Sequence, residues 1–313
     1  GIAQVSMNIT NINVTPLHVA FDEVCRAAAA RGVRVTGAEI VGLMPKRVLL
    51  DAGRHYLEMQ QRSVGIPEDD IIQIAIKSMS LDQLKPFCPK EKVIEMLLEA
   101  DDDTQKLVDL SVKAFTEETS RESPAPGGGT IAACMGAMGA ALGTMVANLS
   151  AHKRGWDERW EEFSRWAEKG QALQSRLLRL IDDDTAAFNE IMAAFGMPKS
   201  NDEEKNLRSA AIQTATLHAA QVPLETMKTA FEAFALCKAM AENGNPNSIS
   251  DAGVGALAIR AAVRGACMNV KINASSLKDR SLAEPLIAEA DRIAEEADRE
   301  EAAITSFINA RLV

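Results

Sequence analysis

Three consecutive aspartates at residues 182–184 lie in a segment whose apolar residues recur with a helical period. At about 100° per residue, Asp184 falls in the middle of the apolar stripe that includes Leu177 and Phe188, while Asp182 points almost the opposite way. Burial of a carboxylate raises its pKa, which suits a general acid or base. The structural alternative is a buried aspartate satisfied by a helix terminus or a basic neighbour. We expect the other two aspartates to be solvated surface charges.

A glycine triplet is the second chemical signal. Gly127, Gly128 and Gly129 follow two prolines and precede Thr130. Glycine reaches left-handed backbone conformations and permits close approach of another group, so we expect a shaped loop, with Thr130 capping the next helix. That helix is uncharged as far as Ala151 and is long enough to span a membrane. It is rich in Ala, Gly and Met, and the sequence on either side is typical of a soluble protein. Both observations favour a buried core helix instead.

Basic residues are locally enriched at two places. Lys153 and Arg154 follow the apolar helix, and Lys199 lies in a later polar loop. They are candidates for anchoring an anionic ligand in an acidic protein, and a solvated surface role is the alternative for each. Asp251 follows a polar turn at the start of another helix, where complementing the helix dipole is its simplest role. Binding or catalysis is the alternative for this carboxylate.

Composition limits the classes of function. The 313 residues carry a net charge of −10, which argues against nucleic acid as a partner because phosphate binding needs a basic face. Five cysteines form no CxxC pair, which suits reduced thiols in a cytoplasmic protein. Four histidines show no zinc-ligand spacing, so we expect no metal. The sequence shows no signal peptide and begins without methionine, so we expect a fragment of a longer protein.

The residue pattern of the sequence changes after an acidic stretch at 99–104. This change predicts two domains, 1–100 and 105–313. The first should contain both helices and strands, as an α/β domain, because strand-like and helix-like segments alternate in it. The second shows only long helical patterns rich in Ala and should be all-α. The expected strands of the first domain are 5–9, 33–36 and 38–42, and its expected helices are 16–30, 45–59 and 68–79.

Several motifs of the second domain together resemble the cyclodeaminase/cyclohydrolase family of folate enzymes. They include Pro-Gly-Gly-Gly-Thr at 126–130, Asp-Asp-Asp-Thr-Ala-Ala-Phe at 182–188 and Ser-Asp-Ala-Gly-Val at 250–254. Each motif is weak alone, but the ordered set covers residues 105–310. This resemblance implies a helical bundle that acts on tetrahydrofolate derivatives without a metal.

The first domain resembles the second half of a glutamate formimidoyltransferase domain. The resemblance is carried by Val-Thr-Pro-Leu-His at 14–18 and Pro-Phe-Cys-Pro-Lys at 86–90, and it implies a ferredoxin-like α+β fold. The family's catalytic histidine lies in the other half, so His18 and His55 do not inherit its role and transferase activity is expected to be incomplete. The two matches in this order resemble the bifunctional formimidoyltransferase-cyclodeaminases of histidine degradation.

The resemblance implies conversion of 5-formimidoyl-tetrahydrofolate to 5,10-methenyl-tetrahydrofolate and ammonia. It places the family's catalytic aspartate at Asp184, the residue that helix geometry also selects. Polyglutamylated folate is the expected ligand, and homo-oligomers are expected. Two alternatives stay open: a methenyltetrahydrofolate cyclohydrolase, and a non-catalytic folate-binding or oligomerisation module.

The resemblance also implies roles for the remaining candidates. The glycine triplet 127–129 would shape a loop against the substrate. Lys153, Arg154 and Lys199 would meet the carboxylates of the glutamate tail. Asp251 would accept hydrogen bonds from the amino edge of the pterin ring.

Overall fold

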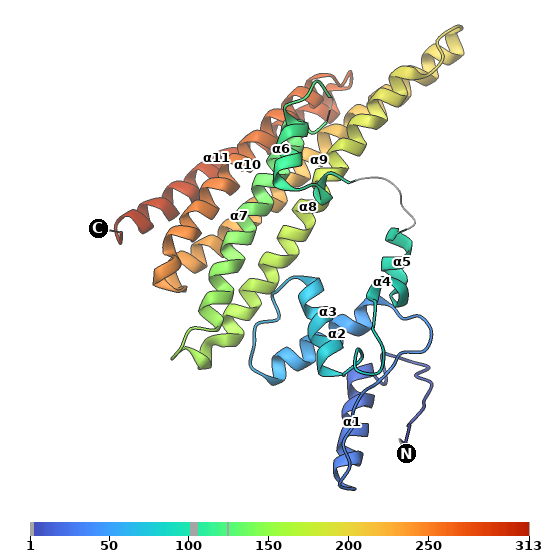
Figure 1. The fold of residues 1–313 in the computed structure, drawn as a ribbon. Helices are drawn as coiled ribbons and strands as arrows, with labels where there is room; N and C mark the ends of the chain where they lie inside the picture. The colour runs from blue at the N-terminus through green and yellow to red at the C-terminus, as the bar shows by residue number, and fades with distance from the viewer. Residues whose placement is uncertain (1–2, 101–105, 124, 313) are drawn as a thin grey trace.

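The computed structural model describes residues 3–100, 106–123 and 125–312 (Figure 1). Within these ranges the regular elements are helices, and one isolated parallel β-bridge joins Met44 to Val93. In chain order the elements are α1 (Leu17–Ala29), α2 (Lys46–Met59), α3 (Glu68–Ser78), α4 (Pro89–Lys92), α5 (Ile94–Ala100), the 3₁₀ turn η1 (Leu107–Asp109), α6 (Val112–Thr119), α7 (Gly128–Ala151), η2 (Asp157–Arg159), α8 (Trp160–Gly196), α9 (Asp202–Asn243), η3 (Pro246–Ser248), α10 (Ile249–Ser275) and α11 (Arg280–Asn309).

The amino-terminal part has a small core of its own. It is built mainly by α2 and α3, whose buried residues include Leu49, Ile71 and Ile72. The three helices expected from the sequence in this part are confirmed as α1, α2 and α3, with ends that agree within a residue or two. These helices carry one apolar face each, which is the pattern that made them recognisable.

The three strands predicted for this part do not form, so an α+β ferredoxin-like fold is not what the described residues show. Segments 5–9, 33–36 and 38–42 form no regular secondary structure, and Val5, Val33 and Val41 are exposed. A strand is stabilised by hydrogen bonds and side-chain contacts to a neighbouring strand, and the described residues supply no such neighbour. The β-propensity of these segments is therefore not sufficient to make a sheet.

The carboxy-terminal part is a bundle of long antiparallel helices, α7 to α11, as expected from its sequence (Figure 1). Helix α7 lies against α8, α9 and α10, and α11 lies against α9 and α10. The small residues of α7 allow these close approaches: a Cβ on Gly139 would lie 2.8 Å from the carbonyl oxygen of Gly255, and a Cβ on Gly143 would lie 2.8 Å from the Leu236 side chain. The glycine faces are thus used for packing within the chain.

Helix α7 is long and apolar enough to cross a membrane by length and composition alone. It is also a central helix of the bundle, and 61% of its most apolar window is buried inside the protein. Packing against three neighbouring helices accounts for its lack of charge. The core-helix interpretation of this segment is therefore the one that the fold supports.

Helix α9 contains a proline in its interior, and α10 compensates for it. Pro223 has no N–H, so the carbonyl of Ala219 loses its normal partner within the helix. Asn273 of α10 donates a hydrogen bond from Nδ2 to that carbonyl at 2.7 Å. Ala219 is buried, so the carbonyl would otherwise be left without a donor.

This arrangement predicts a coupling between α9 and α10. We expect Asn273→Ala to lower the free energy of unfolding by about 1–3 kcal/mol, because a buried acceptor is left unsatisfied. In a Pro223→Ala background the N–H of residue 223 returns, and the same substitution should cost less than about 1 kcal/mol. Urea unfolding of the four proteins measures the difference. Equal costs in both backgrounds would show that Asn273 does not replace the missing donor.

The two parts of the chain meet where the loop after α2 lies on α7 and α8. The N–H of Ser63 donates to Nε2 of His152 at 3.2 Å, and the N–H of Val64 donates to Oγ of Ser164 at 3.1 Å. Asn148 donates from Nδ2 to the carbonyl of Gly65 at 2.8 Å. Side chains of the bundle thus bind one backbone group of each of three consecutive loop residues.

His152 makes this contact sensitive to pH. Burial, and next the charge of Arg62, lower the pKa of His152, so the neutral ring that accepts from Ser63 is the folded form. A lowered histidine pKa stabilises the fold above the unfolded pKa of about 6.5, and this stabilisation is lost as the pH falls through the folded value. We therefore expect the Ser63 amide to lose hydrogen-exchange protection below about pH 6.5.

A matched variant isolates the imidazole in this experiment. Glutamine at position 152 keeps an acceptor that does not titrate, so His152→Gln should show protection that is independent of pH over the same range. Protection that falls equally in both proteins would assign the effect to another group.

Candidate active site

Asp184 lies where α8 crosses the first turn of α7. The hydroxyl of Thr130 donates a hydrogen bond to Oδ2 of Asp184 at 2.8 Å. Gly129 lies directly against the same carboxylate, because a Cβ built on Gly129 would be 2.3 Å from Oδ1 of Asp184. Helix geometry predicted that Asp184 faces the bundle, and the half-buried position of its side chain agrees with that prediction.

Burial raises the pKa of Asp184 above its usual range. Hydrogen bonds from the hydroxyl and the backbone of Thr130 act in the opposite direction, since they favour the charged form. A carboxyl group with a raised pKa holds a proton more readily near neutral pH than a solvated one. Asp184 is therefore suited to accept a proton and give it back during a reaction.

The glycine triplet takes a different form from the loop that was expected. Helix α7 begins at Gly128, with Gly127 as its cap residue, so two of the three glycines lie in the first helical turn. Thr130 is the third residue of the helix, not its cap: its hydroxyl accepts from the N–H of Gly127 at 3.2 Å and donates to Asp184. Close approach to the carboxylate, more than loop flexibility, explains a glycine at 129.

Two further polar groups near Asp184 did not stand out in the sequence. A Cβ on Gly128 would lie 3.3 Å from Nδ2 of Asn269, which places this amide of α10 beside the start of α7. The hydroxyl of Thr185 is buried and has no hydrogen-bond partner in the described structure. Asn269 could be recognised only as one polar position on a face of small residues, and no spacing rule singled out Thr185.

Asp182 departs from the surface role expected for it. It is half-buried and accepts a hydrogen bond from the N–H of Leu107 at 2.9 Å, so it anchors the segment that leads into the bundle. Burial raises the pKa of Asp182. Helix periodicity described only α8 and could not include the segment at Leu107 that covers this side of it. Asp183 is exposed, as expected.

Lys153 and Arg154 lie beyond the far end of α7. That helix has 24 residues, which span about 36 Å at about 1.5 Å per residue. Nζ of Lys153 is 4.0 Å from the ring centroid of Trp156. Within one chain these two side chains are therefore not brought to Asp184.

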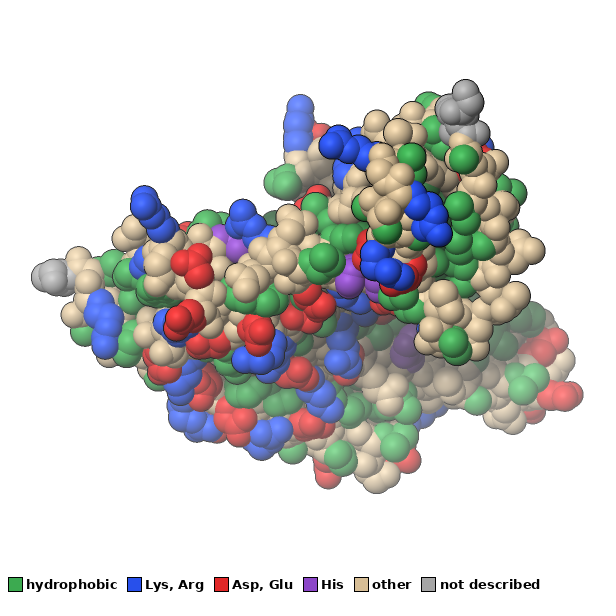
Figure 2. All heavy atoms as spheres, turned by 90° about the horizontal axis from the view of Figure 1, so that it is seen from below, with side chains coloured by type: hydrophobic (Ala, Val, Ile, Leu, Met, Phe, Trp, Pro, Cys, Tyr) green, Lys and Arg blue, Asp and Glu red, His purple; other side chains and the backbone are tan. Residues whose placement is uncertain are grey.

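Asp251 and Lys199 occupy two other positions. Asp251 is in the first turn of α10, one turn before Gly255, which packs against Gly139. Gly139 is ten residues along α7 from Gly129, or about 15 Å, so Asp251 is separated from Asp184. Lys199 is exposed in the loop after α8, at the end of the bundle nearer to Asp184. Figure 2 shows acidic and basic side chains interspersed over the visible face of the bundle.

The described part of the chain contains no cluster of side chains suited to bind a metal ion. No group of three or more His, Cys, Asp or Glu side chains there is arranged to hold a metal ion. The carboxylate of Asp184 accepts a hydrogen bond from the Thr130 hydroxyl and lies against Gly129. The site thus offers proton transfer and hydrogen bonding from the chain's own groups.

Comparison with known proteins identifies both parts of the sequence. The family described as Formiminotransferase-cyclodeaminase matches residues 111–292, and the family described as Formiminotransferase domain matches residues 1–99. The chain is 34% identical to the Formimidoyltransferase-cyclodeaminase of Rattus norvegicus over 311 residues, which is 99% of this chain and 57% of the relative. The chain therefore spans little more than half the length of that relative.

Two other proteins are similar to the bundle. The Methenyltetrahydrofolate cyclohydrolase of Methylorubrum extorquens is 41% identical over 187 residues, which cover 60% of this chain and 90% of that enzyme. The crystal structure of formiminotetrahydrofolate cyclodeaminase from Thermotoga maritima superposes with a TM-score of 0.59 at 26% identity. It covers 66% of this chain and 100% of that structure.

Proposed function

Because this chain belongs to the formiminotransferase-cyclodeaminase family, we propose that its helical bundle is a formimidoyltetrahydrofolate cyclodeaminase. Its substrate would be 5-formimidoyl-tetrahydrofolate, and its products 5,10-methenyl-tetrahydrofolate and ammonia. The observation that carries this proposal is the carboxyl group of Asp184, held by Thr130 against Gly129 with a raised pKa.

The proton balance of the reaction explains why one such carboxyl group suffices. N10 of the folate attacks the carbon of the protonated formimidoyl group, and a new C–N bond forms. N10 must lose its proton, and the former imino nitrogen must gain one before it leaves as ammonia. Asp184 would accept the first proton and donate it to the departing nitrogen, so the group is restored at the end of the cycle. The bundle would hold N10 and the carbon in attack geometry.

A methenyltetrahydrofolate cyclohydrolase is the second candidate, because the 41% identity to such an enzyme favours it specifically. That match covers 60% of this chain, whereas the match to the Rattus norvegicus protein covers 99%. A side-by-side assay separates the two candidates. Release of ammonia from 5-formimidoyl-tetrahydrofolate in step with methenyl absorbance supports the deaminase, and accelerated loss of methenyl absorbance without ammonia supports the hydrolase.

The finer roles of the candidate residues are part of this proposal. Lys199 would meet a carboxylate of a polyglutamate tail, since it lies at the end of the bundle nearer to Asp184. Lys153, Arg154 and Asp251 would reach the same ligand only from another copy of the chain. Tetrahydrofolate would carry the one-carbon group, and the reaction would need no metal. The protein would act in the cytoplasm. A ferredoxin-like sheet around residues 1–100 would require paired strands, which the described residues do not supply. Transferase activity would depend on that sheet.

A homo-oligomer is also proposed, on the evidence of the hairpin formed by the end of α8 and the start of α9. This hairpin projects beyond the other helices (Figure 1), and its exposed apolar side chains include Met192, Phe195 and Leu207. Another copy of the chain would cover them. Light scattering should show a lower mass for Met192→Lys with Leu207→Lys, but not for Val112→Lys on α6. A monomeric unaltered chain would contradict the proposal.

A further inference from the structure

Asn269 of α10 lies beside the first turn of α7. A Cβ built on Gly128 would be 3.3 Å from Nδ2 of Asn269 and 3.7 Å from its Oδ1. A Cβ on the next residue, Gly129, would be 2.3 Å from Oδ1 of Asp184. Consecutive helical residues point about 100° apart, so the amide and the carboxylate approach this turn from two sides. Because both positions are glycine, no side chain of these two residues stands between them.

The amide of Asn269 has a defined orientation. Its Nδ2 donates a hydrogen bond to the carbonyl of Gly265 at 3.0 Å, and only the NH₂ end of the amide can donate. Within the described residues, no group donates to Oδ1. The side chain is half-buried, but its Oδ1 is not among the buried polar atoms without a partner, which belong to His18, Asn148, Thr185 and Thr229. Asn269 therefore presents an acceptor that solvent reaches and that can bind a donor.

The charged side chains of α10 near Asn269 are directed to another helix. Nη2 of Arg264 is 3.0 Å from Oδ2 of Asp298, and Lys271 forms an ion pair with Asp291. Both of these acids belong to α11, so the two cations are engaged on the α11 side of α10. The neutral acceptor of Asn269 favours a ligand that brings an N–H group, above all a cationic one, and disfavours a ligand oxygen that can only accept.

We propose that Asn269 selects the substrate by accepting a hydrogen bond at Oδ1 from the formimidoyl nitrogen. This inference rests on the proposed function for the identity of the substrate. The protonated formimidoyl group carries N–H donors and no acceptor, whereas a formyl group of nearly the same shape ends in an oxygen that can only accept. Against Oδ1 of Asn269 that oxygen finds no donor, so the site loses a hydrogen bond. The contact persists as the nitrogen gains its proton and leaves as ammonia.

The preference can be measured as binding, without turnover. Titration calorimetry of the full chain carrying Asp184→Asn compares 5-formimidoyl-tetrahydrofolate with 5-formyl-tetrahydrofolate. Adding Asn269→Leu should weaken binding of the formimidoyl compound about tenfold or more and change that of the formyl compound by less than about threefold, because leucine has a similar size and no acceptor. Asn269→Ala also removes the acceptor and should give the same loss of preference. A ratio of the two affinities that stays unchanged in both variants would overturn the proposal.

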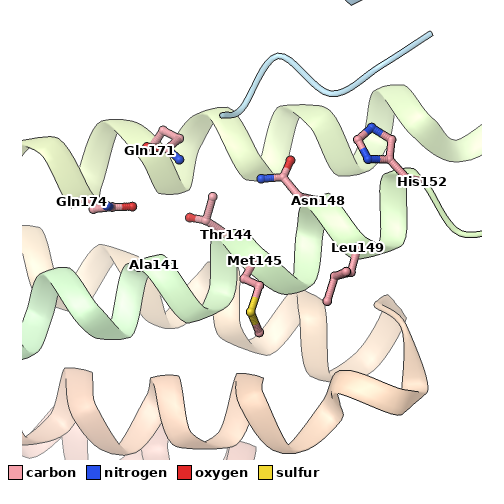
Figure 3. A pocket seen from close by; sticks show the side chains of 8 residues that line it. All are labelled: Ala141, Thr144, Met145, Asn148, Leu149, His152, Gln171 and Gln174. Atoms are coloured by element: carbon pink, nitrogen blue, oxygen red, sulfur yellow. The ribbon is translucent and has the colours of Figure 1, made fainter. Parts of the chain in front are cut away.

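Gln174→Leu is the matched control. Gln174 is another half-buried amide, and it lines an open depression between α7 and α8 (Figure 3). The part of α7 that lines this depression begins at Ala141, which is 13 residues along the helix from Gly128, or about 20 Å. The preference for the formimidoyl compound should be unchanged in this variant. An equal loss of preference in Gln174→Leu and Asn269→Leu would refute the assignment of the contact to Asn269.

Ammonia release by chains that retain Asp184 separates this inference from the proposed function. We expect Asn269→Leu to lower kcat/KM for ammonia release about tenfold or more. Normal ammonia release by both the unaltered chain and Asn269→Leu would keep the proposed function and refute the role of Asn269. A chain that releases no ammonia, yet prefers the formimidoyl compound through Asn269, would refute the proposed function and support the contact. Binding of neither compound would contradict both.

Discussion

Replacing Asp184 by asparagine should reduce ammonia release from 5-formimidoyl-tetrahydrofolate by about 10²–10⁴-fold, the usual contribution of a general acid–base group. Asparagine has nearly the same shape and still accepts the hydrogen bond from Thr130 through its amide oxygen. It cannot take the proton from N10. The expected loss therefore lies in kcat, with the helical content and the unfolding midpoint close to those of the unaltered chain.

The adjacent aspartate provides the control for this substitution. Asp183 is exposed on the same turn of α8, so Asp183→Asn removes the same charge without touching the contact to Thr130. Its turnover should stay within about twofold of the unaltered chain, as is usual for a surface change. Equal losses in both variants would mean that net charge matters here, and normal turnover in Asp184→Asn would remove this residue from the mechanism.

The second large effect is expected at Gly129. An added methyl group would lie 2.3 Å from Oδ1 of Asp184 and 2.8 Å from its Cγ, so Gly129→Ala must displace the carboxyl group or separate α7 from α8. Overpacking of this kind costs about 1–3 kcal/mol of unfolding free energy. Displacement of a catalytic group by about 1 Å can cost about 10²-fold in rate. Urea unfolding and the ammonia assay measure the two effects.

Gly128→Ala tests whether the position or the residue type is responsible. Both glycines lie in the first turn of α7, so alanine changes the local helix propensity similarly at the two positions. At Gly128 the nearest atom to an added Cβ is Nδ2 of Asn269 at 3.3 Å, which a small side-chain movement relieves. Turnover close to normal is expected for this variant. Similar losses in the two variants would show that flexibility of the turn, not contact with Asp184, is what matters.

Sequence reasoning located Asp184 because helix periodicity is a local property. The apolar residues around it have the same period as the helix, and a carboxylate in that stripe must face the bundle. Thr130 is 54 residues away, and no spacing rule predicts that its hydroxyl meets Asp184. The same limit explains Asp182: its partner Leu107 lies 75 residues away, on a segment whose path the sequence does not determine.

The strands predicted for residues 5–9, 33–36 and 38–42 do not form, and the reason differs from the one for Asp182. The segments around Val5, Val33 and Val41 have the composition of strands, but strand formation depends on partners that the described chain does not supply. The helices of the same region need no such partners for their backbone hydrogen bonds, and they form where the sequence predicts them. At Pro223 a contact from elsewhere in the chain permits an element that local sequence disfavours. Asn273 of α10 donates the hydrogen bond that a proline within α9 cannot supply.

The central claim is that the carboxyl group of Asp184, tuned by Thr130, moves the proton in the deamination. The hydrogen bond from Thr130 lowers the pKa of Asp184 and so opposes the effect of burial. Thr130→Val removes this hydroxyl while keeping the shape of the side chain. The pKa of Asp184 should then rise further, whether the group acts first as base or as acid.

The most direct test is the pH dependence of kcat/KM for ammonia release by the unaltered chain and by Thr130→Val. We expect the limb of the profile that reports Asp184 to move to higher pH in the variant. A profile whose limbs stay in place, with activity reduced equally at every pH, would show that the titrating group is not Asp184 and would contradict the account.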